Sequence, residues 1–213
     1  MAEITTTPMT VTPVTLVGTV VRLEPLSHEH LAGLIAVGLA PVLWRWVPTQ
    51  VTTPEEMRAY VVAALEERDR HASLPFAIVD KASGAVIGST RYGNIDGVNR
   101  RVEIGWTWVA RSHQRTGANT DAKRLLLTHA FEVLGAHRVE LKTDALNQQS
   151  RAAIARIGAT QEGIFRSHVV VPARVGPEGE VIPARLRDSV YFSVIAAEWP
   201  VVKARLADLA RRA

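Results

Sequence analysis

A strand-like run, a short glycine-containing loop and a periodic helix follow one another near the middle of the chain, and this junction constrains the fold more than any other feature. The apolar run covers residues 102–110, the loop is 114–119 (QRTGAN), and helical periodicity extends from about 120 to 134. Backbone N–H groups at a helix start lack partners within the helix, and the helix dipole makes that end positive. Gly117 lets the chain approach a ligand closely. The junction therefore predicts an anion site suited to a pyrophosphate.

Two familiar phosphate loops do not fit this segment. It is not G-x-x-x-x-G-K-[ST], which disfavours a nucleoside triphosphate site, and it lacks the three glycines of the dinucleotide fingerprint. Many strand-to-helix junctions bind nothing, so the loop alone leaves both interpretations open. The surrounding sequence has to decide between them.

The loop resembles the motif Q-x-x-G-x-G/A of the GCN5-related N-acetyltransferases (GNAT), which hold the pyrophosphate of coenzyme A with it. The chain matches at Gln114 and Gly117 and departs at Asn119, where the family has glycine or alanine. Asparagine is a good helix N-cap, so this departure suits the start of a helix at about Thr120.

The resemblance extends from about residue 20 to 199 and is strongest to the ribosomal-protein N-terminal acetyltransferases of the RimJ and RimL type. It implies a GNAT-like α/β fold, with a mixed, mostly antiparallel central sheet flanked by helices and a splayed strand pair that holds the cofactor. The stretches that carry it are 21–26, 102–106, 117–123, 147–150 and 158–159.

Local signals predict the same order of elements. Thr53, Pro54 and Glu56 form a capping box that opens a helix to about His71. Breaker-rich 172–187 predicts a long loop. Strands are expected at 19–26, 75–80, 85–92, 101–110, 138–143, 164–171 and 189–195, and further helices at 28–39, 120–134, 148–157 and from 199 onward.

Length and composition predict a single soluble domain. The 213 residues suit one N-acetyltransferase domain at 14–213, preceded by a flexible Thr- and Pro-rich tail at 1–13 that does not read as a secretion signal. This tail favours a cytoplasmic protein, and since no apolar run is long enough to span a bilayer, no membrane partner is expected. The absence of cysteine excludes disulfides, thiolate catalysis and Cys-based zinc sites.

Positive charge is concentrated in the second half of the chain. Residues 1–100 carry 8 Lys and Arg against 10 Asp and Glu, whereas 101–213 carry 17 against 11. This half contains the predicted phosphate loop, so the charge fits a polyanionic cofactor, although surface basic residues are usually only solvated. No zinc-finger, basic-zipper or RNA-binding motif accompanies it, so no specific nucleic-acid partner is expected.

By resemblance, the reaction is transfer of an acetyl group from acetyl-CoA to a primary amine, which has to lose a proton as it attacks. Glu103 is the candidate base, because family members commonly carry an acidic base on this strand. Strand alternation is expected to put Glu103, Gly105 and Thr107 on one face and Val102, Ile104 and Trp106 on the other. The alternative is a structural Glu103 paired with Arg101 or Arg22.

Ser150 is the candidate acid that protonates the departing thiolate. Many family members use a tyrosine seven residues after the motif asparagine, but here that position is Ile154, so Ser150 or water has to substitute. The alternative is a solvated serine in the first turn of a helix capped by Asn147.

The resemblance also assigns binding residues. Trp44 and Trp46 lie in the loop that shapes the acceptor pocket of relatives, although aromatic residues in such loops are more often core lids. The histidines lack ligand spacing, so no metal is expected. The residues expected to bind acetyl-CoA are Trp108 and Val109, through their backbone, with Gln114, Arg115, Thr116, Gly117, Ala118, Asn119, Thr120, Lys123 and Asn147.

The acceptor stays open among three alternatives. A protein N-terminal α-amine leads because of the branch resembled, and a small-molecule amine such as an antibiotic, polyamine or amino acid is the second enzymatic reading. A non-catalytic acyl-CoA-binding or nucleic-acid-associated module is the third, favoured by the missing tyrosine and the basic half. The resemblance and the final strands also predict a homodimer.

Overall fold

The structure, a computed structural model, describes residues 5–176 and 178–211. Within them, one eight-stranded sheet is ordered β1-β2-β3-β4-β5-β6-β10-β7, and every neighbouring pair is antiparallel except β5 and β6. Its strands are β1 (Leu16–Val17), β2 (Val21–Pro25), β3 (Leu74–Asp80), β4 (Val86–Asp96), β5 (Arg101–Val109), β6 (Arg138–Asp144), β7 (Thr160–Val171) and β10 (Arg185–Ile195).

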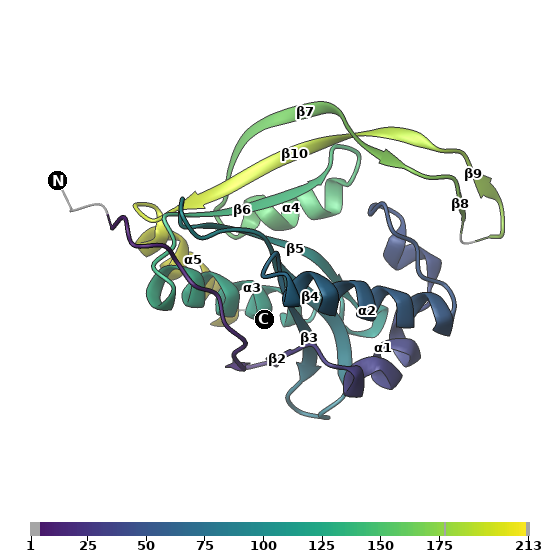
Figure 1. The fold of residues 1–213 in the computed structure, drawn as a ribbon, viewed down its shortest axis with the longest axis horizontal. Coiled ribbons are helices and arrows are strands. Elements are labelled where there is room, and N and C mark those ends of the chain that lie inside the picture. The colour runs from purple at the N-terminus through teal and green to yellow at the C-terminus, as the bar shows by residue number, and fades with distance from the viewer. Residues whose placement is uncertain (1–4, 177, 212–213) are drawn as a thin grey trace.

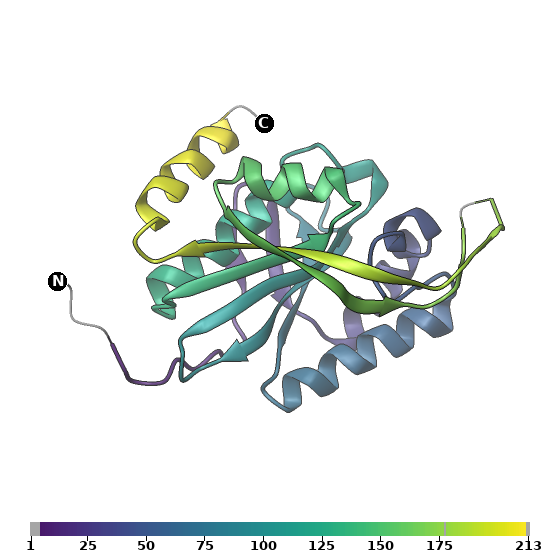
Figure 2. The same ribbon diagram turned by 90° about the horizontal axis from the view of Figure 1, so that it is seen from above.

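Helices cover both faces of the sheet (Figures 1 and 2). The helices α1 (Leu31–Gly38) and α2 (Pro54–Asp69) pack on one face, while α3 (Ala118–Thr128), α4 (Gln148–Arg156) and α5 (Trp199–Arg211) pack on the other. The predicted fold class, a mixed and mostly antiparallel sheet flanked by helices, is confirmed. No helix among the described residues is long and apolar enough to cross a membrane.

The capping box predicted for α2 is present. Thr53 Oγ1 accepts a hydrogen bond from the Glu56 N–H at 3.2 Å, and the Glu56 carboxylate accepts one from the Thr53 N–H at 3.1 Å. These reciprocal bonds satisfy two donors that the helix start would otherwise leave unpaired. The boundary read from the sequence is therefore the boundary in the structure.

The segment 172–187 differs from the predicted irregular loop. It contains the short hairpin of β8 (Arg174–Val175) and β9 (Val181–Ile182), and β10 already begins at Arg185. β7 and β10 pair along most of their length, so they carry this hairpin well beyond the rest of the sheet (Figure 1). The Gly and Pro residues of this segment correctly indicated turns, but they did not indicate the strand pairing between those turns.

The segment predicted as a flexible tail is held by the domain at residues 7–9. The Met9 side chain is buried in the main core, and its N–H donates to Gly97 O at 2.8 Å. Arg100 donates to Thr7 O. No local sequence pattern indicates these contacts, because they form only when the β4–β5 turn is in place. Residues 1–4 of the predicted tail lie outside the described residues.

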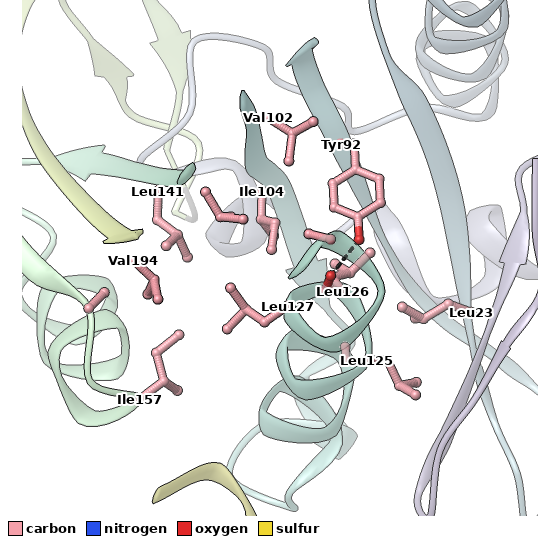
Figure 3. Packing of buried hydrophobic residues seen from close by; sticks show 14 of the residues in the cluster. Leu23, Tyr92, Val102, Ile104, Leu125, Leu126, Leu127, Leu141, Ile157 and Val194 are labelled. Carbon is pink, nitrogen blue, oxygen red and sulfur yellow. Dashed lines mark hydrogen bonds between the residues drawn. The ribbon is translucent and has the colours of Figure 1, made fainter. Parts of the chain in front are cut away.

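The main core fixes α3 against β4 and β5 (Figure 3). Leu125, Leu126 and Leu127 are buried among side chains of the sheet, and Tyr92 of β4 donates its hydroxyl to Leu126 O. A π-helical turn, His129–Val133, follows α3. Burial of apolar surface stabilises by about 25 cal/mol per Å², so these contacts hold α3 in place against β4 and β5.

Candidate functional site

The ladder between β5 and β6 stops after three residue pairs. Arg101, Val102 and Glu103 pair with Arg138, Val139 and Glu140, and beyond them the two strands separate. The remainder of β5, residues 104–109, keeps its pairing with β4 only. The predicted splayed strand pair is therefore present, and the edge of β5 that faces β6 is left without ladder partners.

A bulge in β5 changes which face each later side chain occupies. Arg91 pairs with Gly105 but Ser89 pairs with Trp108, so Trp106 and Thr107 together oppose Thr90. Trp106 adopts a φ of 50°. As a result its indole lies on the face of Glu103, over Gly93 and Arg91, while Thr107 bonds Thr90 on the opposite face. The predicted alternation is right for 102–105 and wrong for Trp106 and Thr107, because a bulge inserts one extra residue.

The loop after β5 forms the start of α3. Gly117 stands at the N-cap with a φ of 72°, and its carbonyl accepts from the Asp121 N–H at 2.8 Å. The helix therefore begins at Ala118, and Asn119 lies inside its first turn. The expectation that Asn119 caps a helix starting at about Thr120 is wrong, because glycine takes the left-handed conformation more cheaply than asparagine and supplies the cap.

The same loop presents a run of free backbone donors. Within the described residues, none of the N–H groups of 115–120 has a hydrogen-bond partner. Gln114 Nε2 donates to Val109 O at 3.0 Å, and Thr116 Oγ1 donates to His113 O at 2.7 Å. Gln114 thus ties the loop to the end of β5, Thr116 ties it to the turn at 111–113, and the free N–H groups lie at the positive end of α3.

Other residues of this segment point into the protein. Thr120 Oγ1 accepts from Arg156 of α4 at 2.8 Å, and Lys123 Nζ donates to Thr107 Oγ1 at 2.8 Å. Both side chains are buried. Burial lowers the pKa of Lys123 to about 7, against the opposing influence of the Glu103 charge. Neither side chain is therefore directed at the loop, and the amine of Lys123 supports β5.

Asn147 caps α4, as predicted. Its Oδ1 accepts from the Ser150 N–H at 3.0 Å, so the side chain of Ser150 stands in the first turn of the helix and is half-buried. Ile154 is buried in the core, where it cannot replace the missing tyrosine. Ser150 keeps a hydroxyl with no recorded partner among the described residues.

Glu103 is buried and has two partners that the sequence did not suggest. Its Oε2 accepts from Asn94 Nδ2 at 2.7 Å and forms an ion pair with Lys142 Nζ at 2.8 Å. The ion pair with Arg101 or Arg22 expected under the structural alternative is not observed: Arg101 pairs with Asp96 and Glu140, and Arg22 pairs with Glu24. The alternation of 138–144 offered a signal for Lys142, since its polar residues share one face of a strand next to β5. Nothing in the sequence pointed to Asn94.

Two cavities lie on the sheet face that carries Glu103, and the buried Glu103 side chain itself lines neither of them. One, of about 310 Å³, is lined by Tyr60 and Glu67 of α2 with Arg91 and Trp106. Arg91 pairs with Glu67 at 2.9 Å. The other, of about 740 Å³, contains Asn94, the partner of Glu103, together with Arg101, Arg138, Glu140, Glu162 and Tyr191 among its lining residues. Both volumes fall in the range of ligand pockets.

The two predicted acceptor-binding tryptophans have different surroundings. Trp44 ends the 3-10 turn η2 (Pro41–Trp44), is buried, donates to Gly38 O at 2.7 Å and packs against Tyr60 and Trp108. This is the core-lid arrangement. Trp46 is half-buried, with the Arg45 guanidinium 4.9 Å from its ring centre. Of the two, only Trp46 presents a partly open ring.

Comparisons with known proteins agree with this geometry. Residues 21–160 match the family described as acetyltransferase (GNAT) domain. YdaF of Bacillus subtilis (strain 168), whose name assigns it provisionally to the ribosomal N-acetyltransferases, is 30% identical over 183 residues, covering 85% of this chain and 92% of YdaF.

Solved structures show the same fold. A GCN5-related N-acetyltransferase from Brucella melitensis is 33% identical with a TM-score of 0.84, covering 96% of this chain and 89% of its own. RimJ of Mycobacterium smegmatis, solved in complex with CoA-disulfide, is 27% identical with a TM-score of 0.76, covering 93% and 96% respectively.

Proposed function

The chain belongs to the GNAT acetyltransferases and is an acetyl-CoA-dependent N-acetyltransferase, and from this we propose that its acceptor is the α-amine of a protein N-terminus. The observation that carries the proposal is the pair of cavities on the sheet face that carries Glu103, one of which is lined by its partner Asn94. A peptide has the length to occupy such a surface, whereas a small amine needs only one of the two cavities. The name of YdaF supports the same class of acceptor.

The donor site is proposed at the splay and the loop after β5. The free N–H groups of 115–120 lie at the positive end of α3. They suit a pyrophosphate, which can bind there without a dedicated side chain. The separated edge of β5 at Trp108 and Val109 suits the amides of a pantetheine arm. The backbone of Gly117, with its φ of 72°, permits the close approach.

In the proposed reaction, the amine nitrogen attacks the thioester carbonyl carbon, and the carbon–sulfur bond breaks as the amide forms. Glu103 takes the proton that the amine loses, directly or through water, and Ser150 gives a proton to the departing thiolate. Lys142 and Asn94 hold the Glu103 carboxylate in place before the reaction. Ser150 recovers its proton from solvent, which reaches its half-buried side chain.

A direct test is to follow CoA release from acetyl-CoA with two sets of acceptors. One set contains peptides with free N-termini, each paired with the same peptide N-terminally blocked. The other contains polyamines, free amino acids and amine antibiotics. Efficient release with free but not blocked peptides supports the proposal, and release only with small amines assigns the alternative acceptor class.

We also propose that the protein acts as a cytoplasmic homodimer. β7 ends the sheet, and exposed Ile164, Phe165 and Val170 lie along it. Such an apolar edge favours pairing with a second copy. Light scattering across micromolar concentrations is expected to give twice the mass of one 23.3 kDa chain, and a constant monomer mass would contradict it.

A further inference from the structure

Arg187 of β10 is a buried cation without a partner. Its side chain is on the face of Glu103, because Arg187, Ser189 and Tyr191 alternate along β10 and the last two pair with Asp144 and Lys142 of β6. The residue is only 6% exposed, and its Nε is buried. Among residues 5–176 and 178–211, the Arg187 side chain makes no hydrogen bond or ion pair.

The carboxylates near Arg187 are committed to other groups. Asp144 pairs with Arg185 and accepts from the Leu146 N–H at 2.9 Å, while Glu103 is held by Lys142 and Asn94. Burial lowers the pKa of the Arg187 guanidinium, and the charges of Asp144 and Glu103 oppose this shift without bonding to it. A guanidinium stays protonated in proteins, so Arg187 remains a buried positive charge. A buried charge without a partner is strongly unfavourable.

The surroundings of Arg187 carry an excess of positive charge. Arg174 of β8 is also buried: it donates to Trp44 O at 2.6 Å and to Arg45 O at 3.2 Å, and its Nη2 has no partner. Four cations and two carboxylates lie close enough to influence one another's charge here, and His168 lies beside them. They are Arg174, Arg185, Arg187 and Lys142 against Asp144 and Glu103.

We propose that Arg187 receives a carboxylate carried by the acceptor, so that this enzyme prefers amines with an acidic group nearby, such as a protein N-terminus followed by Asp or Glu. A guanidinium binds a carboxylate through two parallel hydrogen bonds, which gives both affinity and orientation. The acceptor's acidic group thus supplies the missing partner while Glu103 faces its amine. This proposal rests on the proposed function, of which it specifies the substrate class.

The test uses two peptides that differ only in Glu or Gln at the second and third positions. The wild-type protein is expected to use the Glu peptide with a kcat/KM about 10- to 100-fold higher, the range of a hydrogen-bonded charge pair. Arg187→Gln removes this preference by raising KM for the Glu peptide, with CoA affinity unchanged. Arg166→Gln, an exposed arginine on β7, is the matched control and retains the preference. Glycine against glycinamide separates an α-carboxylate from an acidic side chain.

Measurements of peptide binding and of thermal stability test the Arg187 assignment without relying on turnover. Calorimetry with the CoA-loaded protein should show tighter binding of the Glu peptide to wild type only, and Arg187→Gln should melt no lower than wild type because an unpaired buried charge is removed. Equal use and equal binding of both peptides would overturn the Arg187 assignment, as would weaker CoA binding in Arg187→Gln. Carboxylate-dependent binding without acetyl transfer would overturn the proposed function alone.

Discussion

Lys142 Nζ on β6 lies 2.8 Å from the carboxylate of Glu103 on β5, and this ion pair joins the two parallel strands close to the point where they part. If Glu103 is the base, Glu103→Gln keeps the shape of the side chain but cannot accept the amine proton. Turnover should then fall on the order of 10² to 10⁴-fold with CoA affinity unchanged. Steady-state kinetics and calorimetry measure the two quantities.

Higher pH should restore part of the Glu103→Gln turnover, because solution then supplies more neutral amine. Glu24→Gln is the matched control, since Glu24 is a half-buried carboxylate that pairs with Arg22 and His30 and lines neither cavity. Its turnover should stay near that of wild type. Normal turnover in Glu103→Gln at neutral pH would exclude Glu103 as base.

Gly117→Val should weaken CoA binding without unfolding the protein. Valine disfavours a φ of 72° and brings a branched side chain to the loop that presents the free N–H groups. Gly84→Val is a close control, because Gly84 has the same φ in the β3–β4 turn with open space around it. Both variants should lose similar stability by urea unfolding, and only Gly117→Val should lose CoA affinity. Equal CoA affinity in the two variants would show that the loop at Gly117 does not bind the pyrophosphate.

Because of Lys123, the free energy of unfolding should rise as the pH rises above neutrality. Burial lowers its pKa from 10.5 to about 7, so between these values the unfolded chain holds a proton that the folded chain lacks. The free energy of unfolding then increases with pH by up to roughly 1.4 kcal/mol per pH unit from this group. Urea unfolding at pH 7, 8 and 9 should show that Lys123→Met lacks this increment and is the more stable protein at pH 7. Parallel pH profiles for the two proteins would contradict the prediction.

Ser150→Ala should slow the chemical step while leaving the helix intact. The cap from Asn147 uses the Ser150 backbone N–H, which alanine retains. Turnover is expected to fall by about 10²-fold, the lower end of the effect of proton transfer by a positioned side chain. Asn147→Ala, by contrast, should cost about 1 kcal/mol of stability through the lost cap. Unchanged turnover in Ser150→Ala would assign the proton to water.

Alanine substitutions of the two tryptophans should distinguish a role in core packing from a role in acceptor binding. Trp44→Ala leaves a cavity among Tyr60, Trp108 and the α1–α2 layer, and should destabilise by about 3 to 5 kcal/mol. Trp46→Ala should change stability by about 1 kcal/mol or less and raise KM for the acceptor. Urea unfolding and steady-state kinetics give both values, and an unaltered acceptor KM in Trp46→Ala would remove Trp46 from the pocket.

The sequence predicted those parts of the molecule that local interactions determine. The capping box of α2, the Asn147 cap of α4 and the strand that carries Glu103 each depend on residues within a few positions of one another. The loop before α3 was recognisable because its glycine and glutamine both serve the same turn.

Features that depend on distant partners were not predictable in this way. The bulge at Trp106 follows from the pairing of β5 with β4, and the partner of Glu103 comes from β6, more than thirty residues along the chain. The β8–β9 hairpin is held by Arg174 on carbonyls of η2, and Arg187 became notable only when its neighbours proved to be paired elsewhere. A sequence pattern states which residues are charged but not which charges meet.

The short ladder of β5 and β6 means that the sheet is assembled from two antiparallel blocks, β1 to β5 and β6-β10-β7, joined edge to edge over three residue pairs. We expect an acyl donor bound at the proposed site, where the two blocks part, to contact both of them. Its binding should then stabilise the folded domain by an amount that grows with the logarithm of donor concentration above the Kd. We therefore expect the resistance of this protein to unfolding to rise with the supply of its own acyl donor.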